Sequence, residues 1–195
     1  MEKPAYFFIL ISILSLSTTT TCSLLNKTTD QESLIAFKST IISDPWGILT
    51  KNWSANASIC RWIGVSCSLN RQRVTALNFS GFSFKVIIPP AIGNLTFLAS
   101  LDLSHNNFTS FLPNELSNLS RLELIDFRFN SLTGEISSFG NSLKLRVLNL
   151  GYNLLGGNIP YGIFNLSRTE KVDLTANNLE GGLPKDMCNG FSKLS

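Results

Sequence analysis

The stretch LASLDLSHN, residues 98–106, has leucine at its first, fourth and sixth positions and asparagine at its ninth. The spacing returns in LELIDFRFN (122–130), LRVLNLGYN (145–153) and TEKVDLTAN (169–177), with conservative changes except for Thr169 at the first position of the last copy. A weaker copy, VTALNFSGF (74–82), ends in phenylalanine instead of asparagine. The copies begin at residues 74, 98, 122, 145 and 169. A period of this length indicates supersecondary units that stack along one axis.

The second half of each unit repeats as well. An apolar residue follows each start by ten positions, at Phe84, Phe108, Leu132, Leu155 and Leu179. Glycine comes two positions later in three units, at Gly134, Gly157 and Gly181, where it permits a positive φ. An apolar residue and proline follow in four units, whereas the third has Ile136-Ser137. The asparagine side chains can satisfy backbone groups where the chain leaves the strand.

These repeats predict a leucine-rich-repeat solenoid, because no unit can bury its apolar face alone. We expect parallel strands about 4.8 Å apart on the concave face and 3-10 or loop segments on the convex side. Leu95, Leu119, Leu143 and Leu166 are expected to pack that convex side. The predicted repeats are 74–97, 98–121, 122–144, 145–168 and 169–193, within a repeat region of 74–195.

The N-terminus predicts secretion. Residues 7–16 form a ten-residue apolar run after Lys3, and small residues follow it. A spanning helix needs about 20 apolar residues, so we favour a signal peptide over residues 1–22 rather than a membrane anchor.

Residues 23–70 differ from the repeats and are expected to cap them. Asp30 is the predicted N-cap of a helix with Leu34, Phe37 and Ile41 on its apolar side. Buried tryptophan and a disulfide are expected to complete the cap, from Trp46, Trp53, Trp62, Cys60 and Cys67. Metal binding by the two cysteines and His105 is the less favoured alternative.

The pattern Trp53…Cys60-x-Trp62-x-Gly64-Val65-x-Cys67 resembles the N-terminal cap of plant extracellular leucine-rich-repeat proteins. The L-x-G-x-I-P form of the repeat is similar to their plant-specific class. The combination is most similar to the start of receptor-like kinase ectodomains. This resemblance implies recognition of a protein or peptide ligand, with a co-receptor ectodomain as a further partner. Polygalacturonase inhibitors share the same cap and repeat.

The C-terminus predicts an incomplete array. Leu194 would open a sixth repeat, and Cys188 has no partner once Cys22 is removed and Cys60 pairs with Cys67. We therefore expect a truncated ectodomain, reaching a membrane only through a missing C-terminal part. The alternatives are a soluble polygalacturonase-inhibitor-like protein and a non-functional remnant. The expected location is extracellular, or the plasma membrane if the full-length gene supplies a membrane helix.

The candidate ligand-binding residues lie on the expected concave face: His105, Asp126, Arg128, Phe129 and Tyr152. Aromatic residues and arginine are favoured in interface hot spots, and Arg128 can pair with a carboxylate. The alternative is that these are ordinary variable positions and that the ligand surface lies in missing repeats. The net charge is only +3 and the charged residues are scattered, so the sequence does not suggest nucleic-acid binding.

Catalysis is not expected. Asp102 and Asp126 should lie one strand spacing apart, as a retaining glycosidase pair would. A shallow sheet, however, offers nothing to raise the pKa of one carboxyl group by burial. No nucleotide-binding, metalloprotease or hydrolase motif occurs, so we expect no cofactor and no catalytic metal.

Sequons are dense, which fits secretion. They begin at Asn26, Asn52, Asn56, Asn78, Asn94, Asn107, Asn118 and Asn165. Asn78 would lie on the concave face of the first repeat, where a glycan would block a protein ligand. We therefore hypothesise that binding avoids that repeat, and glycopeptide mapping of Asn78 tests this.

Overall fold

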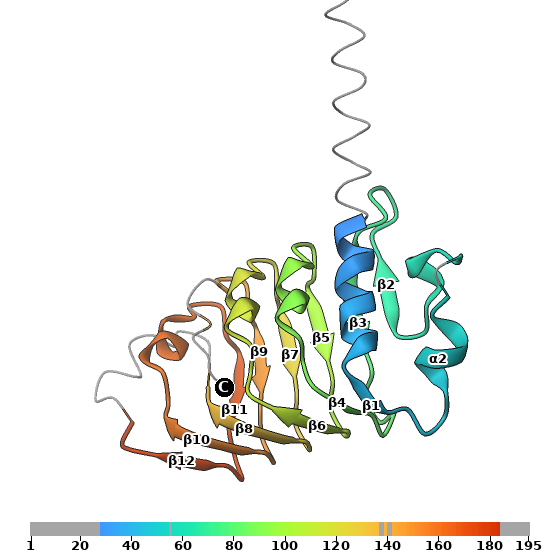
Figure 1. Cartoon of the computed structure of the whole chain (residues 1–195). Helices are drawn as coiled ribbons and strands as arrows, with labels where there is room; N and C mark the ends of the chain where they lie inside the picture. The colour runs from blue at the N-terminus through green and yellow to red at the C-terminus, as the bar shows by residue number, and fades with distance from the viewer. Residues whose placement is uncertain (1–27, 55, 137–138, 140–141, 184–195) are drawn as a thin grey trace, which may run out of the picture.

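The computed structural model describes residues 28–54, 56–136, 139 and 142–183, which form a curved coil (Figure 1). Each repeating turn contributes one strand to each of two sheets. The expected signal peptide, Asn26, Cys22 and Cys188 lie outside the described residues. The parallel strands and the capping disulfide confirm the leucine-rich-repeat fold.

The concave sheet has the order β11-β9-β7-β5-β3-β2. Its strands are β2 (Val65–Cys67), β3 (Val74–Asn78), β5 (Ser100–Asp102), β7 (Leu124–Asp126), β9 (Val147–Asn149) and β11 (Lys171–Asp173). Strands β3 to β11 are parallel, with Leu77, Leu101, Ile125, Leu148 and Val172 side by side. The first four of these side chains are fully buried, which explains the leucine at this position of the repeat. The antiparallel strand β2 pairs with the free edge of β3.

A second sheet, which the sequence did not predict, has the order β1-β4-β6-β8-β10-β12. Its strands are β1 (Ile41–Ser43), β4 (Lys85–Val86), β6 (Asn107–Ser110), β8 (Ser131–Glu135), β10 (Leu154–Asn158) and β12 (Asn178–Glu180). Phe84, Phe108, Leu132 and Leu155, near or within these strands, are fully buried. The outer residues of the repeat therefore line the core from a second side.

Buried and half-buried asparagines join the turns. Asn153 Oδ1 accepts a hydrogen bond from Leu132 N at 3.0 Å, and its Nδ2 donates to the carbonyls of Phe127 and Leu150, also at 3.0 Å. Asn106, Asn130 and Asn177 make the equivalent bonds. Each asparagine thus connects its own turn to the preceding one.

The cap corrects one prediction. Asp30 is not an N-cap but lies inside a helix that includes residues 28–39. Its fully buried carboxylate accepts hydrogen bonds from Arg73 Nε and Nη2, both at 2.8 Å, and from Val74 N at 2.9 Å. The helix is thereby fixed to the start of the first repeat.

The rest of the cap contains α2 (Ile48–Asn52) and the 3-10 helix η1 (Ile59–Arg61). Trp53 and Trp62 are buried with their rings stacked at 4.7 Å, but Trp46 is 67% exposed, contrary to expectation. Cys60 and Cys67 form a disulfide, which excludes the metal-binding alternative for these two residues.

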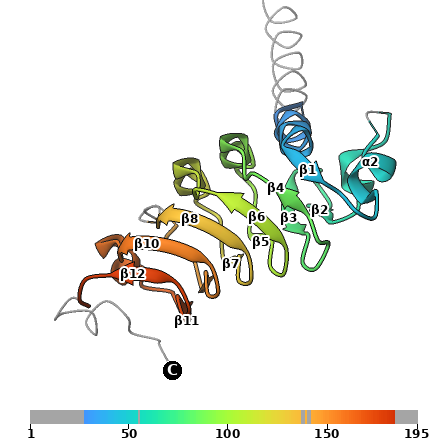
Figure 2. The same cartoon turned by 60° about the horizontal axis from the view of Figure 1, so that its bottom comes forward.

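On the convex side the 3-10 helices η2 (Pro90–Asn94), η3 (Asn114–Asn118) and η4 (Tyr161–Asn165) follow the prolines. Figure 2 shows them along the same side of the coil as the N-terminal helix. The prediction for Leu143 was wrong, because it is 61% exposed. The third repeat is one residue shorter, so Ser142 occupies the buried position and its carbonyl accepts from Leu145 N.

Candidate recognition surface

Three aromatic rings stack on one another across three successive turns. The ring centroids of His105 and Phe129 are 4.5 Å apart with an interplanar angle of 21°, and those of Phe129 and Tyr152 are 4.4 Å apart at 15°. Phe129 is 41% exposed, Tyr152 is 52% exposed and His105 is also exposed. We call these three residues the aromatic ladder. Apolar ring faces and edges on the surface give it the character of a binding platform.

The ladder residues lie just beyond the ends of strands β5, β7 and β9. Their φ angles are 55°, 55° and 58°, in the left-handed region. A residue with a Cβ pays roughly 1–2 kcal/mol for this conformation. Gly81 adopts it at the same position of the first repeat, with φ 72°. Because glycine suffices for the backbone there, the aromatic side chains are not required by the turn itself.

Arg128 and Asp126 lie beside the ladder. Arg128 Nε is 3.3 Å from Asp126 Oδ2, but it is buried and makes no hydrogen bond with the described residues. Burial raises the pKa of the Asp126 carboxyl group, and the nearby Asp102 adds to this, although Arg128 opposes it. The expectation that burial would raise no carboxyl pKa on this sheet was therefore wrong.

The carboxylates of this face have a structural role. Asp102, Asp126 and Asn149 are side by side in register. In each turn the Asp or Asn at this position accepts a hydrogen bond from the backbone N–H two residues later; Asn78 and Asp173 do the same. Such Asx turns satisfy the backbone where the strand ends. This local bond explains the repeated Asp and Asn without a glycosidase pair.

The five predicted site residues therefore come together on three turns, with His105, Phe129 and Tyr152 stacked and Arg128 paired with Asp126. The stacking and the left-handed backbone were not anticipated. The signal was present in the repeat, since all three aromatic residues immediately precede its asparagine.

Sequons lie on both sides of the coil. Asn94 and Asn118 are exposed at the ends of η2 and η3, and Asn78 is exposed at the end of β3. Asn56 and Asn107 are exposed as well, whereas Asn52 is half-buried and its Oδ1 accepts from Ile63 N. The side chain of Asn165 lies outside what the structure describes.

Comparison with known proteins agrees with this architecture. The family model of the leucine rich repeat N-terminal domain matches residues 27–68, and the leucine rich repeat model matches residues 97–119 and 144–166. A chain in the crystal structure of the BIR3–SERK2 complex from Arabidopsis thaliana is similar with a TM-score of 0.73 and 31% identity. The match covers 80% of this chain and 86% of that one. The chain belongs to the plant extracellular leucine-rich-repeat family.

Other plant leucine-rich-repeat proteins are similar over a smaller part of their own length. The ectodomain of GASSHO1/SCHENGEN3 from Arabidopsis thaliana, solved with CASPARIAN STRIP INTEGRITY FACTOR 2, has a TM-score of 0.78 and 32% identity, covering 85% of this chain and 20% of that one. The LRR receptor-like serine/threonine-protein kinase EFR from the same plant is 39% identical over 79 residues, which is 40% of this chain and 8% of EFR. The kinase in that name therefore refers to regions beyond the match.

This plant leucine-rich-repeat fold is a binding module. Within residues 28–183, as far as the structure describes them, no helix has the length and hydropathy to cross a membrane. The same described residues contain no cluster of three or more histidine, cysteine or acidic side chains suited to a metal ion.

Proposed function

We propose that this chain is the N-terminal ectodomain portion of a plant receptor-like kinase or receptor-like protein. In this role it recognises a protein or peptide outside the cell, in the apoplast or at the plasma membrane, with a co-receptor ectodomain as second partner. Two relatives support the proposal through the complexes in which they were solved: GASSHO1/SCHENGEN3 with CASPARIAN STRIP INTEGRITY FACTOR 2, and BIR3 with SERK2.

The observation that carries the proposal is the exposed aromatic ladder. Three residues on successive turns have the positive φ that this position has in all five repeats, and they present aromatic rings to solvent where the first and fifth repeats have Gly81 and Ala176. Tyrosine and arginine are enriched in interface hot spots, and Arg128, 42% exposed beside the rings, can bind a carboxylate of the ligand. An acidic and aromatic peptide therefore fits the surface.

Peptide selection tests the proposal. The full chain, secreted and immobilised, would be used to select from a displayed library of random dodecapeptides. Selected peptides would then be measured against Phe129→Gly/Tyr152→Gly, which relieves the left-handed strain and should keep the fold, as circular dichroism can verify. We expect affinity to fall at least about tenfold.

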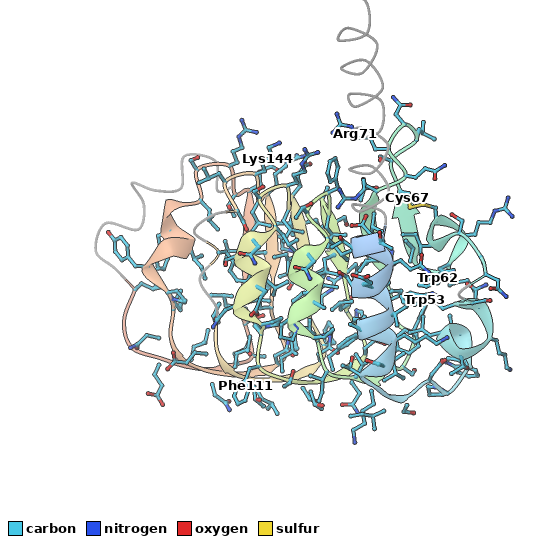
Figure 3. The ribbon with its side chains drawn as sticks, turned by 45° about the horizontal axis from the view of Figure 1, so that its top comes forward. Trp53, Trp62, Cys67, Arg71, Phe111 and Lys144 are labelled. Atoms are coloured by element: carbon cyan, nitrogen blue, oxygen red, sulfur yellow. A yellow bond between two sulfur atoms is a disulfide. The ribbon has the colours of Figure 1, made fainter. Side chains whose placement is uncertain are left out.

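The matched control is Phe111→Ala, because Phe111 is also an exposed phenylalanine, at 69%, but follows β6 of the second sheet and not a strand of the concave sheet. Figure 3 shows Phe111 at the edge of the coil opposite Arg71 and Lys144. This control should change affinity less than about twofold. If every selected peptide binds the ladder variant as tightly as the parent chain, the ladder is not the recognition surface.

A further inference from the structure

A hollow of about 630 Å³ lies where the concave strands begin. Figure 3 shows two of its lining residues, Arg71 and Lys144, along the same edge of the coil. The others that matter here are Leu69, Phe97, Arg121 and Glu123. Arg121 precedes strand β7 and Phe129 follows it, so eight residues separate Arg121 from the aromatic ladder. Eight fully extended residues span at most about 26 Å, and strand β7 lies between the hollow and the ladder, so the hollow is a separate surface.

The repeat itself collects the cations. The residue immediately before each repeat start is Arg73, Phe97, Arg121, Lys144 or Arg168. Neighbouring strands in a sheet are about 4.8 Å apart, so residues 23 or 24 positions apart become adjacent. This register produces a basic edge without any run of lysine or arginine along the chain.

Phe97 holds the guanidinium groups in place. The Cζ atoms of Arg121, Arg73 and Arg71 lie 4.0, 4.5 and 5.6 Å from the centroid of its ring. Arg73 is buried and paired with Asp30. Arg121 and Arg71 are exposed and take part in none of the salt bridges found among the described residues. Cation–π contact fixes such side chains before a ligand arrives, which lowers the entropy cost of binding.

The charge of the hollow is unbalanced. Arg71, Arg121 and Lys144 face one carboxylate, Glu123, which leaves two positive charges uncompensated. The hollow also has an apolar component, because Leu69 is 97% exposed at its rim and Phe97 forms part of its wall. A ligand that complements both features carries carboxylates next to an apolar side chain.

We propose that this hollow, defined by Leu69, Arg71, Phe97, Arg121, Glu123 and Lys144, binds an acidic segment of a protein partner, with carboxylates on Arg121 and Lys144 and an apolar side chain against Leu69. Bidentate pairing favours arginine as the carboxylate ligand. The exposed leucine favours a protein segment over an acidic polysaccharide, which has no aliphatic side chain to cover it.

Fluorescence anisotropy of the full chain with a labelled dodecapeptide of four Leu-Glu-Glu repeats tests the proposal. Binding is expected at low salt and should weaken as salt rises. Arg121→Gln/Lys144→Gln should reduce affinity about tenfold or more, and Leu69→Ser several-fold. Lys51→Gln/Lys85→Gln removes the same charge elsewhere and should change affinity less than about twofold. Phe129→Gly/Tyr152→Gly should leave this binding unchanged, which separates this result from the ladder proposal.

Three results would overturn the proposal. The first is no binding of the Leu-Glu-Glu peptide, or equal binding of a Leu-Gln-Gln peptide. The second is an equal loss in the Lys51→Gln/Lys85→Gln control. The third is tighter binding of oligogalacturonate that depends on Arg121 and Lys144 but not on Leu69, which would assign the hollow to a polysaccharide.

Discussion

Replacing Asn153 with alanine tests how the turns are held together. Asn153 is 6% exposed, and its Oδ1 is the acceptor for the buried N–H of Leu132. An orphaned buried donor costs about 1–3 kcal/mol. The carbonyls of Phe127 and Leu150 keep second donors from Asn130 and Asn177, so the loss of these bonds adds only about 0.5 kcal/mol each. We expect the free energy of unfolding to fall by about 3 kcal/mol.

Urea denaturation followed by two probes measures this effect. All three tryptophans, Trp46, Trp53 and Trp62, precede the repeats, so their fluorescence reports on the cap, whereas far-ultraviolet circular dichroism reports on the whole coil. Because each turn contacts only its neighbours, Asn153→Ala should make the dichroism transition begin before the fluorescence transition. The exposed Asn178 provides the control, as Asn178→Ala. A loss below about 1 kcal/mol, or one equal to the control, would refute the role assigned to Asn153.

Three further predictions concern other residues. Ser110 has φ 134° where later turns have glycine, so Ser110→Gly should stabilise the chain by about 1 kcal/mol and raise Tm by about 2–4 °C in a thermal scan; an unchanged Tm contradicts this. Burial raises the pKa of Asp126. Its contribution to the stability of the fold is therefore favourable at low pH and is lost as pH rises. Asp126→Asn should stabilise the chain at pH 7 but not at pH 3. The hydrogen bond from Thr175 lowers the pKa of Asp173. The contribution of Asp173 to the stability of the fold is therefore lost as pH falls. Asp173→Asn should destabilise the chain at pH 7 but not at pH 3. Urea denaturation should show that each substitution changes the free energy of unfolding by less than about 1 kcal/mol. If both substitutions change stability in the same direction at pH 7, the assigned directions of the two pKa shifts are wrong. Asp30→Ala should cost about 3–5 kcal/mol by leaving Arg73 buried without its partner, and Asp30→Ala/Arg73→Met should recover part of it; a double variant less stable than the single would contradict this.

The sequence predicted the concave sheet because its leucines have a strict spacing. Leu101 and Leu148 are buried as expected, and the asparagine side chains donate hydrogen bonds to backbone carbonyls where the chain leaves each strand. The second sheet escaped prediction because its strands contain glycine and polar residues and offer little alternation. The error at Leu143 came from a one-residue deletion, which shifts every position after it. Asp30 was misassigned because its partner, Arg73, is 43 residues away in sequence.

The two surfaces differed in how visible they were. The aromatic ladder could be found because its members stand beside the repeat asparagine, although the sequence could not show that their rings stack. The basic hollow was missed because charge was sought along the chain. Its members, such as Arg121 and Lys144, are separated by a whole repeat and become neighbours only through the register of the sheet.

The arrangement of sequons bears on which partner can reach these surfaces. Glycans at Asn94 and Asn118 would extend from the convex side and leave the concave sheet open. A glycan at Asn78 would stand at the end of β3, one strand from Asp102, whereas the aromatic ladder begins on the next turn and continues away from it. The hollow lies at the opposite ends of the same strands. Its lining residue Thr75 precedes Asn78 on β3 by three residues, which is roughly 10 Å along the strand. Ligands of the two surfaces therefore need not compete, and a single partner that engages both must lie across β5 and β7.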